Sequence, residues 1–143
     1  MQDNMPTVAD CRLIELQQIQ DRAGNITPVT GAVDVPFKIR RVFFVYDIPS
    51  GQERGEHVHK SCHQLLVAVS GSFEVVLDDG ESQRVVLLNR PNYALQVPPG
   101  VWSSQRRYSA AAVCLVLASE VYDEEDYIRN YELFKEWRCT TSQ

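Results

Sequence analysis

Short runs of β-forming residues, each ended by a turn signal, recur along most of this chain and restrict it to an all-β architecture. Ser70-Gly71 and Asp78-Asp79-Gly80 are turn signals of this kind. Within a run, apolar residues alternate with others, as at Phe73, Val75 and Leu77, which is typical of half-buried strands. Many short strands with few helices predict a β-sandwich or barrel. The expected strands span residues 11–20, 37–48, 63–70, 72–78, 83–88, 93–97 and 111–119.

The C-terminal segment follows a different pattern, in which aromatic residues recur at three- and four-residue spacing. Such spacing places them in one stripe along a helix. Asp123 stands where an N-cap would, and Asp126 follows three residues later, an arrangement that caps a helix start. We therefore expect a helix over about 123–137 that packs on the strands or on a partner chain. The stripe consists of Tyr127, Tyr131, Phe134 and Trp137.

The 143 residues amount to about one domain. With no repeat or linker, we expect a single domain over residues 1–143, with its core at about 10–120. A formal net charge of −5 argues against nucleic acid as a partner. Apolar stretches fall well short of the roughly 20 residues of a membrane-spanning helix, and no secretory signal is visible. We expect no membrane partner, a cytoplasmic location and reduced cysteines.

Two histidines, His57 and His59, form the motif that carries most chemistry. Side chains of a strand repeat their direction every second residue, so both imidazoles would face the interior of a barrel. The spacing of His57, His59 and Gln64 between two glycines resembles the first conserved motif of the cupin superfamily, with Gln64 in place of the usual Glu. In the second motif, Pro98-Pro99-Gly100-Val101-Trp102 is followed by Ser103 where His is expected. The resemblance implies a cupin jelly-roll β-sandwich or barrel with a short C-terminal α-helix.

The side chains at these motif positions argue against a metal. A mononuclear metal in this fold would need about three histidines and one carboxylate, whereas Gln64 offers an amide and Ser103 a hydroxyl. His63 adds an imidazole, but as the neighbour of Gln64 in a strand it should face the opposite side. Two imidazoles without a metal suit proton transfer near neutral pH. We expect no metal and no other cofactor.

Further blocks extend the resemblance over about residues 10–135. They lie at 41–46, 54–60, 64–66, 71–72, 78–80, 97–102 and 117–123. Together and in this order they are similar to the dTDP-4-keto-6-deoxy-D-glucose 3,4-ketoisomerase family, small cupins of deoxyaminosugar biosynthesis. The resemblance implies a metal-independent homodimer that moves the carbonyl from C4 to C3 of a 6-deoxyhexose attached to dTDP.

The implied reaction removes a proton next to a carbonyl, passes through an enediol or enediolate, and returns a proton to the neighbouring carbon. His59 is the leading candidate for the base at C3, with His57 relaying protons or polarising the carbonyl oxygens, although the two roles can be reversed. Tyr46, at the end of the preceding strand, can exchange a hydrogen bond with the enolate oxygen. Gln64 can fix the tautomer of an imidazole.

The nucleotide of such a substrate needs cations for its diphosphate and a flat apolar face for its thymine. Arg54, just before the histidine pair, and Arg41, on an alternating strand face, are diphosphate candidates, as is Arg106. Trp102 or Tyr108 can stack on the thymine. The full set of expected substrate-binding residues is Arg54, Arg41, Gln64, Trp102, Ser103, Arg106 and Tyr108.

Other functions remain alternatives at the level of sequence. A non-enzymatic nucleotide-sugar-binding cupin would keep the cavity and the arginines without needing both histidines. A metal-dependent cupin isomerase or dioxygenase lacks its ligands here, and the related epimerase of the rhamnose pathway has a longer chain. The aromatic stripe and the apolar N-terminal strand exceed what one barrel needs for closure, which predicts a homodimer.

Overall fold

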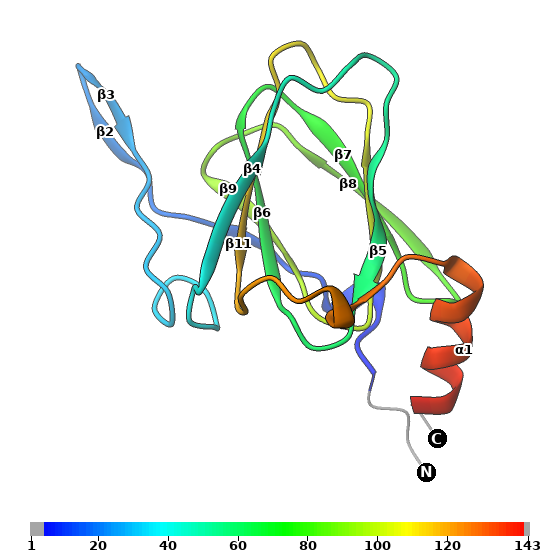
Figure 1. The fold of residues 1–143 in the computed structure, drawn as a ribbon. Coiled ribbons are helices and arrows are strands. Elements are labelled where there is room, and N and C mark those ends of the chain that lie inside the picture. Colours follow the sequence, from blue (N-terminus) through cyan, green and yellow to red (C-terminus); the bar gives the residue numbers. More distant parts are fainter. Residues whose placement is uncertain (1–4, 142–143) are drawn as a thin grey trace.

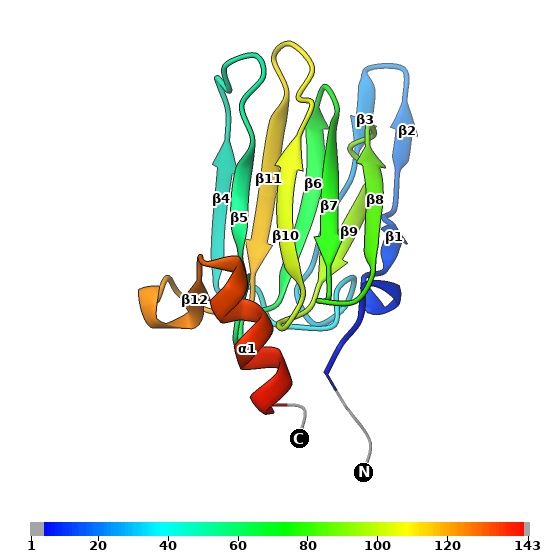
Figure 2. The same ribbon diagram turned by 90° about the vertical axis from the view of Figure 1, so that its right-hand side faces the viewer.

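The computed structural model describes residues 5–141, which form two antiparallel β-sheets stacked face to face with a helix at one end (Figures 1 and 2). The first sheet has the order β1 (Leu13–Glu15), β9 (Tyr93–Val97), β6 (Gln64–Ser70), β11 (Val113–Ala118) and β4 (Arg41–Val45). The second has the order β12 (Tyr127–Ile128), β5 (Arg54–His59), β10 (Trp102–Arg106), β7 (Phe73–Asp78) and β8 (Gln83–Leu88). This arrangement confirms the predicted all-β sandwich.

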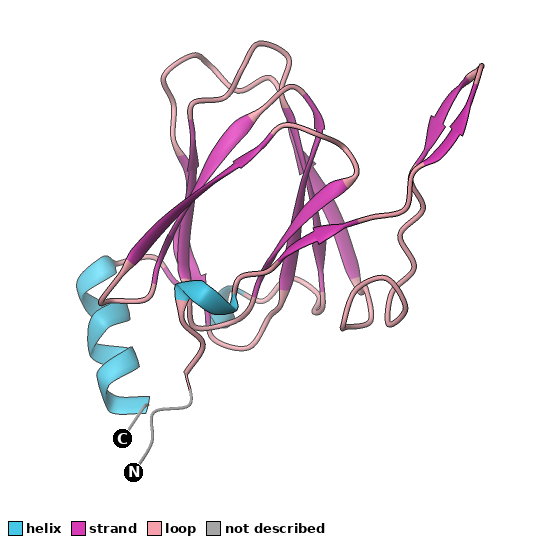
Figure 3. Cartoon of the chain, turned by 180° about the vertical axis from the view of Figure 1, so that it is seen from behind, coloured by secondary structure: helices cyan, strands magenta, loops and turns pink. Residues whose placement is uncertain are grey.

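Several further elements lie outside the two five-stranded sheets. The hairpin of β2 (Ile19–Asp21) and β3 (Gly24–Ile26) projects away from the sandwich (Figure 1). A 3₁₀ turn, η1 (Val8–Asp10), precedes β1. Helix α1 (Tyr131–Thr141) lies beside one end of the strands (Figure 3). Among the described residues, no helix is long and apolar enough to cross a membrane.

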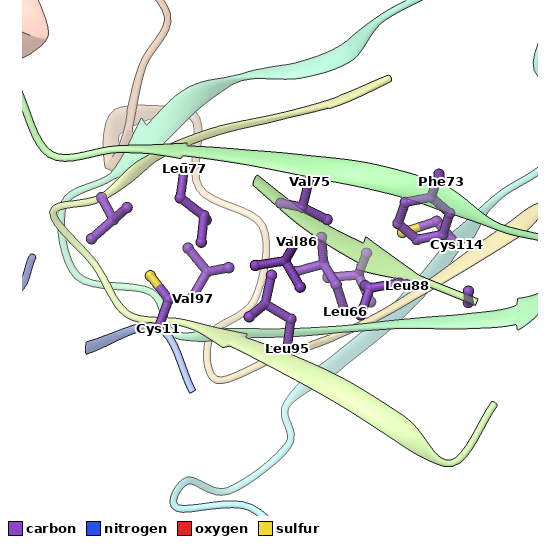
Figure 4. Packing of buried hydrophobic residues seen from close by; sticks show 13 residues of the cluster. Cys11, Leu66, Phe73, Val75, Leu77, Val86, Leu88, Leu95, Val97 and Cys114 are labelled. Carbon is purple, nitrogen blue, oxygen red and sulfur yellow. The ribbon is translucent and has the colours of Figure 1, made fainter. Parts of the chain in front are cut away.

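The main hydrophobic core lies between the two sheets and takes residues from β6, β7, β8, β9 and β11 (Figure 4). Phe73, Val75 and Leu77 of β7 are fully buried, while the residues between them are only half-buried, which is the alternation the sequence predicts. Burying a side chain of this size contributes about 1.5–3 kcal/mol to folding. Phe43 and Val45 of β4 are only partly buried and pack against this core.

Strand β10 is absent from the strands that the sequence predicts. Its residues Ser103 and Gln105 face the interior although they are polar, so the strand shows no apolar alternation. The expected strand over 11–20 is also wrong in extent: its two halves pair separately, as β1 with β9 and as β2 with β3. Hydrophobic patterning therefore fails where a strand lines a polar site or changes its partner.

The C-terminal helix begins at Tyr131 rather than at about 123. Asp123 does act as an N-cap, but of a single 3₁₀ turn, η2 (Glu124–Asp126). The chain then extends as β12, which pairs with β5 and places Tyr127 opposite His59. Pairing with a sheet edge satisfies the backbone that a continuous helix would have paired internally. Tyr127 is therefore not part of the aromatic stripe on the helix. Phe134 is in the helix and is fully buried.

Candidate active site

A cavity of about 180 Å³ opens between the two sheets, and the core residue Val116 forms part of its wall. Residues of β4, β5, β6, β10, β11 and β12 form its walls, so both sheets contribute to it. The lining combines apolar side chains of β4 and β11 with one histidine, two glutamines, one tyrosine and two arginines. The lining residues are Phe43, Val45, Arg54, Gly55, His57, Gln64, Gln105, Val116, Tyr127 and Arg129.

The two histidines lie side by side on β5 and share a third ring, that of Tyr127. The His57 and His59 ring centroids are 4.8 Å apart with the rings edge to face. Tyr127 contacts both, at 5.0 Å from His57 and 4.4 Å from His59. Within residues 5–141, the buried Nε2 atoms of both histidines have no hydrogen-bond partner. Of the two histidines, His57 lines the cavity, whereas His59 is buried beside it and is not among the lining residues.

Both imidazoles are neutral at physiological pH. Burial, the neighbouring His59 and Arg129 lower the pKa of His57 from its ordinary value of 6.5 to about 3. Burial also lowers the pKa of His59, although the hydrogen bond to Asp126 opposes this change. A neutral imidazole can accept a proton, so either histidine can act as a base without first being deprotonated.

Asp126 contacts His59 from the side opposite its free nitrogen. The Nδ1 and Oδ2 atoms of the pair are 2.8 Å apart, and both side chains are buried. The carboxylate also accepts hydrogen bonds from the loop after β5, at Ser61 and Cys62. Burial alone would raise the pKa of Asp126, but the hydrogen bonds from Ser61 and His59 outweigh it and lower the pKa. This contact could not be predicted from the sequence, in which Asp126 stands three residues after Asp123 and resembles part of a helix cap.

A β-bulge turns Arg54 into the cavity. Ser103 pairs with His57, and Gln105 pairs with Arg54. Between these two pairs, β5 therefore contains one residue more than β10. Gly55 lies in the bulge with φ of 80°, a left-handed conformation that glycine adopts without strain. In a regular strand, a residue three positions from His57 would face the opposite side. The bulge is what brings Arg54 to the histidine face.

Two more arginines stand around the ring of Tyr127. Arg129, which the sequence analysis did not single out, lines the cavity and lies 4.3 Å from the Tyr127 ring centroid. It also donates to Glu124 at 2.9 and 3.0 Å. Arg41 donates from Nη2 to the Tyr127 hydroxyl over 3.5 Å. Three cations near one small cavity suit an anionic ligand such as a diphosphate.

Three expected site residues point elsewhere, because strand alternation places them on outer faces. Tyr46 is 58% exposed and contacts Phe44, whereas Val45 between them lines the cavity. Trp102 packs against Tyr131 and Phe134 of α1 and lines a separate hollow of about 370 Å³ on the outer face of the second sheet.

Arg106 is the third of these residues, and it is ion-paired with Glu74 at 2.9 Å. Trp102, Tyr46 and Arg106 are therefore not among the residues that line the cavity beside His57.

The remaining candidates lie in or behind the cavity wall. Gln64 lines the cavity, but Asp126 rather than Gln64 is the partner of His59 Nδ1. Ser103 is buried on the interior face opposite His57. Tyr108 stands behind the wall, where it packs on the core residue Phe73 and donates to Gln105 Oε1 at 2.9 Å. Tyr108 therefore supports Gln105 and does not itself line the cavity.

One cluster among the described residues has the composition of a metal site: His59, Cys62 and Asp126 offer ligand atoms within 4.8 Å of one another. Both oxygens of Asp126 already accept hydrogen bonds, Oδ1 from Ser61 and Oδ2 from Cys62. The Cys62 thiol contacts the His63 carbonyl oxygen at 3.4 Å. The existing hydrogen bonds account for the cluster as a support for His59.

The fold and the cavity together define a cupin-type β-sandwich with two histidine rings on β5. The family described as FdtA: WxcM-like, C-terminal matches residues 9–138. TDP-4-oxo-6-deoxy-alpha-D-glucose-3,4-oxoisomerase of Aneurinibacillus thermoaerophilus is 38% identical over 126 residues, which cover 88% of this chain and 91% of that protein. The chain therefore belongs to this family, and it is an enzyme of the keto-isomerase class, an intramolecular oxidoreductase.

Solved structures of sugar 3,4-ketoisomerases are similar to this chain in fold and sequence. QdtA, a sugar 3,4-ketoisomerase from Thermoanaerobacterium thermosaccharolyticum, in complex with TDP, has a TM-score of 0.91 and 35% identity, covering 95% of this chain and 99% of that one. A histidine-to-asparagine mutant of the same protein in complex with TDP-4-keto-6-deoxyglucose has a TM-score of 0.89 and 36% identity, covering 91% and 94%. These likenesses confirm the predicted cupin jelly roll with a C-terminal helix.

Proposed function

We propose that this enzyme converts dTDP-4-keto-6-deoxy-D-glucose to a dTDP-3-keto-6-deoxyhexose by proton transfer at the histidine pair. The observation that carries the proposal is the pair itself: two buried neutral imidazoles with free Nε2 atoms, beside a cavity bordered by arginines. Relatives that act on or bind this sugar nucleotide support the choice of substrate.

The reaction rearranges hydrogen without any net gain or loss. His59 Nε2 takes the proton from C3, and the electrons of that C–H bond form the C3=C4 double bond of an enediolate as the C4 carbonyl oxygen becomes an alkoxide. His57 exchanges protons with the two oxygens, so that the C3 hydroxyl loses its proton and becomes the new carbonyl. C4 then receives a proton and carries the hydroxyl. The roles of the two histidines can be exchanged without changing this balance.

The arginines and Tyr127 supply the remaining functions. Arg54 and Arg129 line the cavity and can hold the diphosphate through charge-assisted hydrogen bonds. Arg41 orients the Tyr127 hydroxyl. Tyr127, rather than Tyr46, then offers a phenol to the enediolate oxygens, because it stands over both histidines.

The test is to incubate the protein with freshly prepared dTDP-4-keto-6-deoxyglucose in deuterated buffer and to follow the sugar by NMR. We expect a 3-keto product with deuterium at C4. Binding of the intact substrate without exchange or product would instead identify a nucleotide-sugar-binding module. His59→Asn serves as the control for exchange that the protein does not catalyse.

The proposal includes a homodimer and a reducing compartment. The edge strand β4 exposes Val42, Phe44 and Tyr46 to 55%, 58% and 58%, an apolar face that a second copy of this chain can cover. All four cysteines are free, as is typical of cytoplasmic proteins. A 3-keto group is also what an amine-transferring reaction at C3 would consume, in keeping with deoxyaminosugar biosynthesis.

A further inference from the structure

Asp126 lies in an environment that only a carboxylate satisfies. Its Oδ1 accepts from the Ser61 backbone N–H at 2.7 Å and from the Ser61 hydroxyl at 2.8 Å. Its Oδ2 faces the Cys62 backbone N–H at 3.3 Å and His59 Nδ1 at 2.8 Å. Each oxygen therefore meets a backbone N–H, a group that can only donate. The loop after β5 holds the carboxylate in one orientation.

This geometry decides which nitrogen of His59 carries the hydrogen. An ionised carboxylate can only accept hydrogen bonds, so Nδ1 must donate to Oδ2. A neutral imidazole that carries its hydrogen on Nδ1 has a bare lone pair on Nε2. The Nε2 atom of His59 is the one left without a partner among the described residues. Asp126 thus keeps that nitrogen in the form that can accept a proton.

We propose that Asp126 is a positioning residue that holds His59 in the Nδ1–H tautomer and so makes Nε2 the base of the reaction. This inference rests on the proposed function for its catalytic consequence, but the tautomer itself is a property of the unliganded protein. Asp126 reaches His59 from η2, 67 residues further along the chain, and it takes the part that the sequence analysis gave to Gln64.

The substitution Asp126→Asn makes a sharp test because asparagine has one acceptor and one donor. Its oxygen should take the Oδ1 position, where two Ser61 donors lie at 2.7 and 2.8 Å. Its NH₂ group then takes the Oδ2 position and donates to His59 Nδ1. His59 must in response carry its hydrogen on Nε2, where it can no longer accept a proton. The variant therefore reverses the tautomer while keeping the shape of the side chain.

Nitrogen-15 NMR of the imidazoles measures the tautomer without any substrate. The chain has three histidines, so the spectrum is simple, and the signals missing from His59→Asn identify those of His59. We expect Nδ1–H in the wild-type protein and Nε2–H in Asp126→Asn. The matched control is Asp123→Asn, which removes a charge from the same turn, retains capping ability and does not contact His59. It should keep the wild-type tautomer.

Kinetics then connect the tautomer to the reaction. Asp126→Asn should lower kcat roughly 10²- to 10⁴-fold, the range expected when a base is lost or held in the wrong tautomer. Asp123→Asn should turn over like wild type. In a His59→Asn background, Asp126→Asn should cost little more, because its effect runs through His59.

Different outcomes separate this inference from the proposed function. An Nε2–H tautomer in the wild-type protein would overturn the role of Asp126 whether or not the enzyme is active, and so would an unchanged Nδ1–H tautomer in Asp126→Asn. Equal kcat values for Asp126→Asn and Asp123→Asn would overturn it as well. A wild-type protein that lacks isomerase activity but shows the expected tautomers would refute the proposed function and leave the positioning of His59 standing.

Discussion

Replacing Gly55 by alanine should disturb substrate binding through Arg54, although Gly55 has no side chain to contact a ligand. Its φ of 80° costs a residue with a Cβ about 1–2 kcal/mol. The new Cβ would also stand 3.1 Å from Gln105 Nε2, so that side chain must give way. The strain is relieved if the bulge straightens, and a straight strand turns Arg54 to the outer face.

The magnitudes follow from these contacts. The free energy of unfolding should decrease by about 1–2 kcal/mol, which lowers Tm by roughly 2–8 °C for a domain of this size. If Arg54 leaves the cavity, the charge-assisted hydrogen bonds to the diphosphate are lost, at about 1.5–3 kcal/mol. That loss corresponds to a KM roughly 10- to 100-fold higher. Thermal unfolding and steady-state kinetics measure the two effects separately.

Gly51→Ala is the matched control. Gly51 has φ of 82°, and its Cβ would meet no described atom within 4 Å. This variant should lose similar stability but keep the wild-type KM. If Gly55→Ala also keeps the wild-type KM despite its lower Tm, the bulge does not direct Arg54 to the substrate and the reasoning is refuted.

Four further predictions concern the site. His59→Asn should lower kcat at least about 10²-fold while calorimetry still detects TDP binding; retention of more than about a tenth of kcat would contradict its role as base. Exhaustive chelation should leave turnover unchanged, and elemental analysis should find no stoichiometric transition metal. Tyr127→Phe should reduce kcat about 10-fold, whereas Tyr46→Phe should not, in the same NMR assay. Folding lowers the pKa of His57 from 6.5 to about 3, so the unfolded chain binds a proton at a higher pH than the folded protein does. The free energy of unfolding, measured in urea, should therefore decrease as pH falls below 6.5, by up to about 1.4 kcal/mol per pH unit. His57→Gln should flatten this slope.

Strand periodicity accounts for what the sequence could predict. The alternation of Phe73, Val75 and Leu77 located β7 because its inner face meets an apolar core. The same period-two rule placed His57 and His59 on one face of their strand; their ring centroids are 4.8 Å apart, and His57 lines the cavity. These predictions need only local geometry, because the direction of a side chain in a regular strand follows from its position.

The rule fails where the strand is irregular or where the inner face is polar. The bulge at Gly55 shifts the register by one residue and so brings Arg54 to the cavity. The spacing of residues in the sequence does not reveal this shift. Tyr46 was assigned to the site by its nearness to the end of a strand, whereas the parity of β4 turns it outward. Strand β10 could not be predicted from hydrophobic alternation, because its inner face is polar.

The C-terminal segment shows why the rest of the site requires tertiary structure. Asp123 caps η2 as its sequence suggests, and the Asp126 backbone N–H donates to the Asp123 carbonyl oxygen at 3.0 Å. That turn directs the Asp126 carboxylate into the loop after β5, and the two residues of β12 that follow pair with β5 and set Tyr127 against both histidines. The same short pairing that completes the sheet edge therefore also assembles the site. A change that breaks this pairing should reduce activity before it unfolds the core, because neither residue of β12 belongs to the main core cluster.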